Sequence, residues 1–511
     1  MLSGDDRSAF PRQTASAALG GAAFDVLVIG GGIVGSGVAR DAAMRGLRTA
    51  LVDAHDFAFG TSSRSSRLLH GGLRYLAQGR VGLVREASVE KVTLHRIAPH
   101  LADPLPFLFP TRRGTEWKLW KLRIGVKMYD LLCSGRNLGK STSIGREEIL
   151  TELPGLNSEN LTGAVRYFDG LTNDARLVLD TIRSAAANGA VVRNYTPLES
   201  AQRQADLWRC RVRDCESGQT IELSAKCVVN AAGAWASRFP ASRTALRLTK
   251  GVHLVIDRSR LPVPSAVVMT EGKRILFAIP WGDRVILGTT DTDYDGPIET
   301  PTCEKSDVAY ILRITNDTFP NAKLTPENVI SAWAGLRPLI ANPNGTPSDI
   351  SRAHKIQMTE PGWIDVAGGK LTTYRLMGEQ TVDLVVRHTG AAPQPCRTAA
   401  TPLLPGDAKP PFSGIVPPAI SEEAVEHYCR SEWAVHLEDV MVRRTSWRYY
   451  HRDQGAVARQ VAGWMARVLG WGREKMQEEI ARYEQGIEAS GCAAGDVAVE
   501  ARGLAAAAVA Q

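Results

Sequence analysis

The segment Phe24-Asp-Val-Leu-Val-Ile-Gly-Gly-Gly-Ile-Val-Gly35, together with Leu51-Val52-Asp53 downstream, decides the fold class of this chain. The apolar run 26–29 is typical of a short buried parallel strand. A helix-like stretch follows the glycines and stops at Gly46, since glycine commonly ends helices. A strand, a glycine-rich turn, a helix and a second strand in this order predict a Rossmann-type nucleotide-binding unit.

Three glycines and one acid give this unit its chemistry. Gly30 allows the tight turn, Gly32 lets backbone N–H groups approach a pyrophosphate, and Gly35 lets the helix press onto the strand. The helix N-terminus then faces the phosphates. Asp53 ends the second strand, where a carboxylate accepts hydrogen bonds from an adenosine ribose and repels a 2′-phosphate. We therefore expect a nucleotide cofactor other than NADP.

Size and composition set the outer limits. The chain has 511 residues, of which 44% are hydrophobic and 23% charged, enough for two or three domains. A net charge of +7 favours anionic ligands or an anionic membrane surface, but no nucleic-acid-binding motif accompanies it. The eight cysteines show neither C-x-x-C nor Cys/His ligand spacing, so we expect no metal site and a reducing, cytoplasmic compartment. No apolar run is long enough for a membrane-spanning helix.

The order of predicted elements indicates an α/β fold whose Rossmann-type domain is discontinuous. A helix over 173–187 continues this domain, and 208–213 with 220–223 form a predicted hairpin. Short strand-like runs between 252 and 334 predict an inserted, mainly antiparallel β domain that acts as a substrate or cap domain. A helix over 305–316 is expected to lie on it.

The last part of the chain is expected to be a small all-α domain. Apolar residues recur there at helical spacing, after a stretch rich in proline and glycine. The domain boundaries we predict are a disordered N-terminal extension (1–23), the nucleotide-binding domain (24–100, 160–245 and 345–400), the substrate or cap domain (101–159 and 246–344), a linker (405–420), the helical domain (421–490) and a tail (491–511).

A second informative region is Gly60-Thr-Ser-Ser-Arg-Ser-Ser-Arg-Leu-Leu-His-Gly-Gly-Leu-Arg-Tyr75. Its hydroxyls and backbone amides can bind a pyrophosphate, and the glycines after His70 let the chain pass close to a planar ring. A solvated serine loop is the alternative, and composition alone does not separate the two. The two-glycine turn, and its position directly after the ribose-binding acid, favour the functional interpretation.

A third cluster combines Arg337, Arg352 and the segment Gly368-Gly-Lys-Leu-Thr-Thr-Tyr-Arg375, which opens a predicted helix. Such a helix start offers free N–H groups and the positive end of a dipole, which would stabilise negative charge on a reduced flavin. Arg337 and Lys370 are candidates for binding an anionic substrate, because arginine forms paired hydrogen bonds to phosphate and lysine acts as a point charge. For either residue alone, a surface cation or an ion pair is the competing interpretation.

With these pieces the chain resembles the FAD-dependent glycerol-3-phosphate dehydrogenases, within the D-amino-acid-oxidase-like flavoenzymes. The resemblance runs from about Asp25 to about Leu404. The matching pieces follow in the right order: Ile29-Gly-Gly-Gly-Ile33, Thr61-Ser-Ser63, Leu69-His-Gly-Gly-Leu-Arg-Tyr-Leu76, Asp174-Ala-Arg-Leu177, Lys250-Gly-Val-His253, Gly288-Thr-Thr-Asp291, Gly335-Leu-Arg-Pro-Leu339 and Gly368-Gly-Lys-Leu-Thr-Thr-Tyr-Arg375.

The resemblance implies that FAD lies non-covalently across the nucleotide-binding domain. The cofactor-binding residues it implies are Gly30, Gly32, Ile33, Gly35, Asp53, Thr61, Ser62, Ser63, His70, Gly71, Gly72, Ala232, Gly233, Gly369, Lys370, Leu371 and Thr372. It also implies that Arg337, Arg352 and Lys370 hold the phosphate of a glycerol phosphate, while Arg74 and Tyr75 approach from the other side.

The implied reaction is oxidation of sn-glycerol 3-phosphate to dihydroxyacetone phosphate, with hydride transfer from C2 to flavin N5. This reaction needs a base near C2, cations for the phosphate and stabilisation of the reduced flavin. His70 or His253 is a candidate base, and we favour His70, although a histidine that only holds a turn is nearly as good an interpretation. The rival functions are a flavoenzyme of the same fold acting on another small hydroxy acid or amino acid, and a non-catalytic nucleotide-fold binding protein.

The region 115–133 bears on the electron acceptor. Trp117, Trp120, Ile124, Met128 and Leu131 share one helical face among several cations, as in a helix that lies on a bilayer surface. A helix that covers the substrate domain is the alternative. Relatives usually deliver electrons to a membrane quinone and some use oxygen, so a peripheral position on the inner face of the cytoplasmic membrane is compatible with the sequence, as is a homodimer.

The chain departs from the family pattern in three places. Val34 stands where asparagine is common, and Asp53 stands where glutamate is usual. The approach to the helical domain is compressed to the proline-rich linker, and this bears on dimer contacts and membrane docking.

Overall fold

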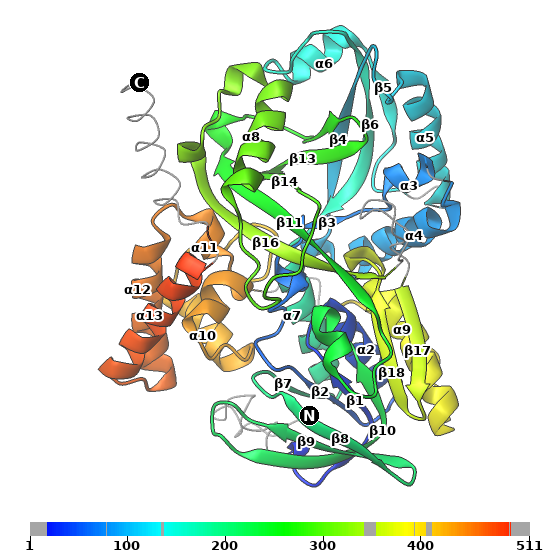
Figure 1. Ribbon diagram of the computed structural model, residues 1–511, viewed down its shortest axis with the longest axis vertical. Coiled ribbons are helices and arrows are strands. Elements are labelled where there is room, and N and C mark those ends of the chain that lie inside the picture. The colour runs from blue at the N-terminus through cyan, green and yellow to red at the C-terminus, as the bar shows by residue number, and fades with distance from the viewer. Residues whose placement is uncertain are drawn as a thin grey trace.

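The computed structural model describes residues 18–77, 79–133, 137–341, 354–392, 394–404, 411–489 and 491 (Figure 1). In the view of Figure 1, a sheet with helices packed on it forms the lower part, and a second, larger sheet forms the upper part. The C-terminal helices, coloured orange to red, lie beside the junction of the two parts. The α/β fold class predicted from the sequence is confirmed.

The lower sheet is the Rossmann-type sheet. Its strands follow the order β17-β18-β10-β1-β2-β7, and the pairs from β18 to β7 are parallel. β1 is buried along most of its length, as its apolar sequence predicts. The bounds are β1 (Ala23–Ile29), β2 (Thr49–Val52), β7 (Val191–Arg193), β10 (Thr220–Asn230), β17 (His354–Glu360) and β18 (Trp363–Gly368).

Helices α2 (Ile33–Met44), α7 (Asp174–Ala187) and α9 (Tyr374–Thr389) pack together beside this sheet. A Cβ on Gly378 of α9 would lie 2.7 Å from the carbonyl of Gly37 in α2, so the two helix backbones touch. The predicted helix over 173–187 is confirmed, with Asn173 as its N-cap. The predicted hairpin is also confirmed, as β9 (Leu207–Arg213) pairs with β10, while β8 (Leu198–Gln204) pairs with β9.

The upper sheet has the order β15-β11-β14-β13-β12-β4-β6-β3, with β16 paired to β11 and β5 paired to β6. Its pairs are antiparallel except β12 with β4, among the strands that the structure describes. The bounds are β3 (Leu68–Leu69), β4 (Asp103–Arg112), β5 (Thr142–Ile144), β6 (Leu161–Leu171), β11 (Leu246–Asp257), β12 (Ala266–Glu271), β13 (Arg274–Trp281), β14 (Arg284–Gly288), β15 (Thr292–Asp293) and β16 (Val329–Ile340).

Two helical groups cover the upper sheet. The predicted helix on the sheet is α8 (Lys305–Thr318), which starts with a capping box formed by Glu304 and Asp307. On another side lie α3 (Leu73–Ala77), α4 (Val81–Ile97) and α5 (Leu119–Leu132), and the short α6 (Arg146–Glu152) packs against β6.

The C-terminal domain is all helical, as predicted, with a core of its own that includes Val461, Met465 and Tyr483. Its elements are α10 (Glu422–Ser431), a π-helical turn (Asp439–Arg444), α11 (Trp447–Tyr450), α12 (Gln454–Leu469) and α13 (Arg473–Ala489). Met465 and Tyr483 are both buried in this core.

The chain passes between the two sheets more often than the expected boundaries allow. β3 and β6 belong to the upper sheet, although both lie in segments that we assign to the nucleotide-binding domain. At the N-terminal side, Leu19 is fully buried and β1 includes Ala23, so ordered structure begins before residue 24. Part of the expected linker, 405–410, and most of the expected tail lie outside the described residues.

Within the described ranges, none of the helices has both the length and the apolar character that crossing a membrane requires. The same residues contain no group of histidine, cysteine and acidic side chains that could hold a metal ion.

Candidate active site

The glycine-rich turn between β1 and α2 has the geometry that the sequence predicts. Gly30 has φ +103°, and a Cβ there would lie 2.6 Å from the carbonyl oxygen of Ala231. A Cβ on Gly35 would lie 1.9 Å from the carbonyl oxygen of Gly30, so only glycine lets α2 approach the turn. Gly32 precedes α2 and lines a cavity, and a Cβ there would meet only the Ser62 hydroxyl, at 3.2 Å. The turn thus leaves room in front of the helix N-terminus for a phosphate group.

Asp53 stands at the end of β2 and lines the same cavity. Its carboxylate accepts hydrogen bonds from the N–H groups of Gly31, at 2.5 Å, and His55, at 2.8 Å. Burial raises the pKa of Asp53 to about 7, although both hydrogen bonds lower it. Each carboxylate oxygen retains lone pairs for the hydroxyls of a ribose.

The cavity beside this turn has a volume of about 630 Å³ and extends from Asp53 to the segment before α9. It brings together residues from seven separate stretches of the chain, and its extent from the ribose-binding position to the start of α9 suits an elongated dinucleotide. Of the predicted cofactor residues, those that line it are Gly30, Gly32, Ile33, Asp53, Thr61, Ser62, His70, Ala232, Gly233, Gly369, Lys370 and Leu371.

A second cavity of about 960 Å³ lies next to the first, under α5 and against the upper sheet. Ser66, Leu68, His70 and Arg337 line both cavities, so the two meet at these residues. Cations outnumber acids along its wall, which favours an anionic ligand: the cations are Lys118, Lys121, Lys273, Arg274 and Arg337, and the acids are Glu116, Asp169 and Asp291.

The His70-Gly71-Gly72 turn lies where the cavities meet. The Thr372 hydroxyl accepts a hydrogen bond from the His70 N–H at 3.0 Å and lies 3.2 Å from the His70 carbonyl oxygen. Gly72 has φ +82°, and a Cβ there would lie 2.5 Å from the ring of Tyr75. Thr372 therefore fixes the backbone that carries the His70 side chain, and glycine is needed beside it.

A buried polar network that the sequence did not reveal supports this turn from behind. The Gly71 N–H donates to the Tyr129 hydroxyl at 2.7 Å, and that hydroxyl donates to Asp169 at 2.5 Å. Lys91 completes the network at 2.9 Å from the same Asp169 oxygen. Burial raises the pKa of Tyr129 well above its usual value, so its hydroxyl stays a neutral donor.

The two predicted phosphate-binding cations differ in the cavities that they line, since Arg337 lines both and Lys370 lines only the first. Arg337 in β16 donates to the Thr289 hydroxyl at 2.9 Å and lies 3.2 Å from the Asp291 carboxylate. Lys370 lies 3.5 Å from the Gly71 carbonyl oxygen and 4.3 Å from the centre of the Tyr75 ring. The ion-pair alternative therefore holds for Arg337 in part, but its side chain still lines both cavities.

His253 in β11 lies deeper than His70. Its Nε2 is 2.8 Å from the Ser66 hydroxyl, and its ring stacks on Trp333 with centroids 5.2 Å apart. Burial, with the nearby charges of Arg337 and Arg67, lowers the pKa of His253 to about 3. The ring is therefore neutral at physiological pH.

Some predicted residues lie outside these walls. Arg352 is beyond the described residues, and the side chain of Arg74 is not described. Tyr75 and Gly72 line the second cavity only. Gly35, Ser63, Gly71 and Thr372 stand behind the lining and support it.

The sequence reasoning missed several lining residues. Ser66 and Arg64 lie inside the segment 60–75 but carried no assignment there. His55, Phe59 and Trp235 form an aromatic group beside Asp53, with the His55 and Phe59 rings 4.2 Å apart. The available signal was closeness in sequence to predicted cofactor residues: His55 and Phe59 follow Asp53, and Trp235 follows Gly233.

Comparisons with known proteins identify the family of this chain. Residues 25–384 match the family described as "FAD dependent oxidoreductase", and residues 416–476 match the "C-terminal domain of alpha-glycerophosphate oxidase". The glycerol-3-phosphate dehydrogenase of Mycobacterium leprae is 38% identical, over 94% of this chain and 91% of that protein. The aerobic glycerol-3-phosphate dehydrogenase of Staphylococcus aureus is also 38% identical, over 78% of this chain and 74% of that protein.

Among solved structures, the glycerol-3-phosphate dehydrogenase from Bacillus halodurans complexed with FAD is similar, with a TM-score of 0.76 and 28% identity. The match covers 95% of this chain and 98% of that one. The family match extends over more than half of the chain, and the relatives above are aligned over most of their lengths. The chain therefore belongs to the FAD-dependent oxidoreductases and, within them, to the glycerol-3-phosphate dehydrogenase family.

Proposed function

We propose that this protein binds FAD and oxidises sn-glycerol 3-phosphate to dihydroxyacetone phosphate. The observation that carries the proposal is the meeting of two cavities at His70 and Arg337, one suited to a dinucleotide and one rich in cations. Bound FAD supplies the redox chemistry by accepting the hydride from C2. The relatives described above are glycerol-3-phosphate dehydrogenases, and this supports the same substrate.

FAD would be held along the first cavity. Asp53 would accept hydrogen bonds from the ribose hydroxyls, and the N-terminus of α2 would face the pyrophosphate. Ser62 already accepts a hydrogen bond from the Ile33 N–H at 3.0 Å, so its hydroxyl stands at that helix start. The segment 369–371, directly before α9, would lie beside the flavin end.

The substrate phosphate would be bound by Arg337 and Lys370, with Arg352, Arg74 and Tyr75 completing the set that the family motifs imply. Arg337 has a fixed guanidinium, because Thr289 and Asp291 orient it at the cavity wall. The doubly negative substrate phosphate would attract the Arg337 guanidinium more strongly than the single charge of the Asp291 carboxylate does.

His70 would accept the proton of the C2 hydroxyl. Its side chain lines both cavities, and Thr372 holds its backbone. His253 is the poorer base, since a group whose pKa is about 3 binds a proton too weakly at neutral pH. We assign His253 the role of a neutral partner of the Ser66 hydroxyl at the cavity wall.

Anaerobic flavin bleaching tests the substrate. We expect glycerol 3-phosphate to bleach the bound flavin, while glycerol at the same concentration does not, because the cations of the second cavity select for the phosphate. Bleaching by 2-hydroxyglutarate or by D- or L-amino acids instead would favour the rival flavoenzyme. A purified protein that takes up no FAD would favour the non-catalytic rival.

We further infer that the electrons pass to a membrane quinone and that α5 contacts the membrane. Helix α5 exposes an apolar stripe of Trp120, Ile124, Met128 and Leu131, with Lys118, Lys121, Arg123 and Lys127 exposed around it. Exposed tryptophan beside cations suits an anionic lipid surface. Ile124 and Met128 also line the second cavity, so a lipid-soluble acceptor would reach that cavity from the lipid side.

A further inference from the structure

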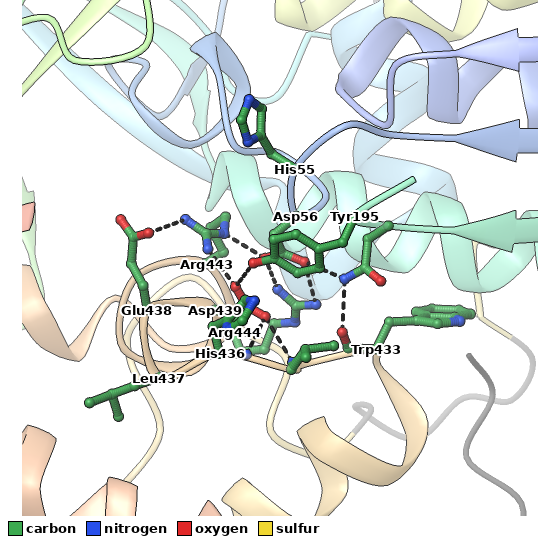
Figure 2. A network of polar contacts seen from close by, with 12 residues as sticks. His55, Asp56, Tyr195, Trp433, His436, Leu437, Glu438, Asp439, Arg443 and Arg444 are labelled. Atoms are coloured by element: carbon green, nitrogen blue, oxygen red, sulfur yellow. Dashed lines mark hydrogen bonds and ion pairs between the residues drawn. The ribbon is translucent and has the colours of Figure 1, made fainter. Parts of the chain in front are cut away.

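The loop that follows β2 turns one of its acids away from the cofactor cavity. Asp56, three residues after Asp53, is fully buried and faces the C-terminal domain (Figure 2). Arg443 donates to its Oδ2 at 2.5 Å, and Arg444 donates to its Oδ1 at 3.0 Å and also to Oδ2. Both guanidinium groups come from the π-helical turn of the C-terminal domain. Two cations from a separate domain thus hold one carboxylate of the nucleotide-binding loop.

The two arginines are themselves fixed. Arg443 binds Asp439 at 2.6 Å, and Asp439 also accepts the Tyr195 hydroxyl at 2.6 Å. Arg444 donates to the Glu432 carbonyl oxygen at 2.6 Å. Figure 2 shows these side chains grouped around Asp56. A buried carboxylate with this many oriented donors has little freedom, because each donor would be left unpaired if the loop moved.

The same loop forms the wall of the first cavity. Asp53, His55, Phe59 and Gly60 line it, on both sides of Asp56 in sequence. Two guanidinium groups lie near the Phe59 ring, that of Arg64 at 5.4 Å and that of Arg443 at 5.8 Å from its centre. Holding Asp56 therefore also holds the residues that would contact the adenosine half of the cofactor.

We propose that Arg443 and Arg444 are positioning residues for FAD, which hold the loop 53–60 in its cofactor-binding conformation through Asp56. The helical C-terminal domain then contributes to the affinity for FAD. Without these cations, the buried Asp56 carboxylate would keep a hydrogen bond from the Asn194 amide, at 3.0 Å, but would lose both of the positive charges that neutralise it. The loop would then relax towards water, because an uncompensated buried charge is costly. The proposal concerns FAD binding and does not depend on which substrate the enzyme oxidises.

Two matched lysine variants of the full-length protein test the proposal. Arg444→Lys keeps the positive charge but loses the two-pronged contact with Asp56. Arg176→Lys is the control, because Arg176 is equally buried in the same interface and binds Glu432 at 2.5 and 2.9 Å. In the described structure Arg176 neither lines the cavity nor contacts the loop 53–60. Asp56→Asn is a third variant that removes the charge.

The readouts are the FAD dissociation constant, from flavin fluorescence on dilution of the holoenzyme, with KM and kcat at saturating FAD and the melting temperature. For Arg444→Lys we expect a dissociation constant about tenfold higher or more, with KM unchanged and kcat restored by excess FAD. For Arg176→Lys we expect a lower melting temperature but an FAD dissociation constant within about twofold of the wild type.

Three outcomes would overturn the proposal. Arg444→Lys and Asp56→Asn could keep wild-type FAD affinity. Arg176→Lys could lose as much FAD affinity as Arg444→Lys, which would make the contact a mere domain attachment. Arg444→Lys could also stay unfolded even in excess FAD, whereas rescue of its folding by FAD would support the proposal by mass action.

Discussion

At the scale of single residues, the two candidate histidines differ in burial and in position. His253 is buried, stacked on Trp333 and flanked by the positive charges of Arg337 and Arg67, so its pKa is lowered to about 3. His70 lies at the meeting of the two cavities, with its backbone held by Thr372. This difference favours His70 as the proposed proton acceptor and His253 as the proposed neutral hydrogen-bond partner.

Replacement of the two histidines should separate these roles. His70→Gln should lower kcat/KM by about 100-fold or more, because the C2 hydroxyl loses its base. His253→Gln, which keeps a side chain able to bond the Ser66 hydroxyl, should have a smaller effect. Steady-state kinetics with glycerol 3-phosphate measure both, and the flavin absorbance spectrum shows that FAD remains bound. The reverse ranking of the two variants would contradict the assignment.

At the scale of elements, α5 has two opposite apolar faces. Leu122, Val126 and Tyr129 are buried against the domain, whereas Trp120 is 58% and Leu131 is 76% exposed. The helix therefore covers the domain and also exposes four of the five residues of the apolar face expected from the sequence. The fifth, Trp117, precedes α5 and is half-buried, with its indole N–H donating to the Gly272 carbonyl oxygen at 2.9 Å. The buried face carries Tyr129, whose hydroxyl supports the His70-Gly71-Gly72 turn, so α5 connects an exposed surface with the candidate active site.

Charge introduced into the stripe should weaken membrane binding. We expect Ile124→Glu combined with Leu131→Glu to lower sedimentation with anionic phospholipid vesicles by about tenfold, since two apolar contacts become acids that the lipid charge repels. Val416→Glu is the control, because Val416 is another exposed apolar residue, 42% exposed, outside α5. If the wild type, the double variant and Val416→Glu sedimented equally with the vesicles, α5 would be ruled out as the docking surface.

At the scale of the whole molecule, buried ion pairs join the C-terminal domain to the nucleotide-binding domain. His436 lies between Glu216 of the nucleotide-binding domain, at 3.1 Å, and Glu479 of α13, at 2.8 Å. Hydrogen bonds to these acids raise the pKa of His436 to about 9 against the opposing effect of burial. Arg482, 3.1 Å from a ring nitrogen, and Lys475, paired with Glu479, offset part of this attraction.

The stability of the protein should therefore fall in mildly alkaline solution. The folded-state pKa of His436 lies above its ordinary value near 6.5, so protonation of His436 favours the folded state. This stabilisation is fully present below pH 6.5. This contribution, at most about 3 kcal/mol, is lost as the pH rises through about 9. Denaturant unfolding at pH 6, 8 and 9.5 measures it, and His436→Gln should flatten the dependence. If the free energy of unfolding of His436→Gln fell with pH as steeply as that of the wild type, the role of His436 would be refuted.

Much of the fold could be predicted because its signals are local. The helices 173–187 and 305–316 and the hairpin at 208–223 follow from apolar spacing and turn residues within each segment. The membership of β3 and β6 in the upper sheet could not be predicted, since strand partners such as Leu105 and Asp169 are far apart in sequence. The apolar pattern within a strand does not indicate which sheet that strand joins.

The sequence by itself determined the nucleotide-binding turn, because Gly30, Gly35 and the acid at the end of β2 are required by backbone geometry within one short segment. Only the tertiary structure decided which side chains support that turn and the His70 turn. Asp56 and Arg443 are 387 positions apart, and Tyr129 and Gly71 are 58 apart. Such pairs are selected by folding, which buries a polar group only where a distant partner satisfies it.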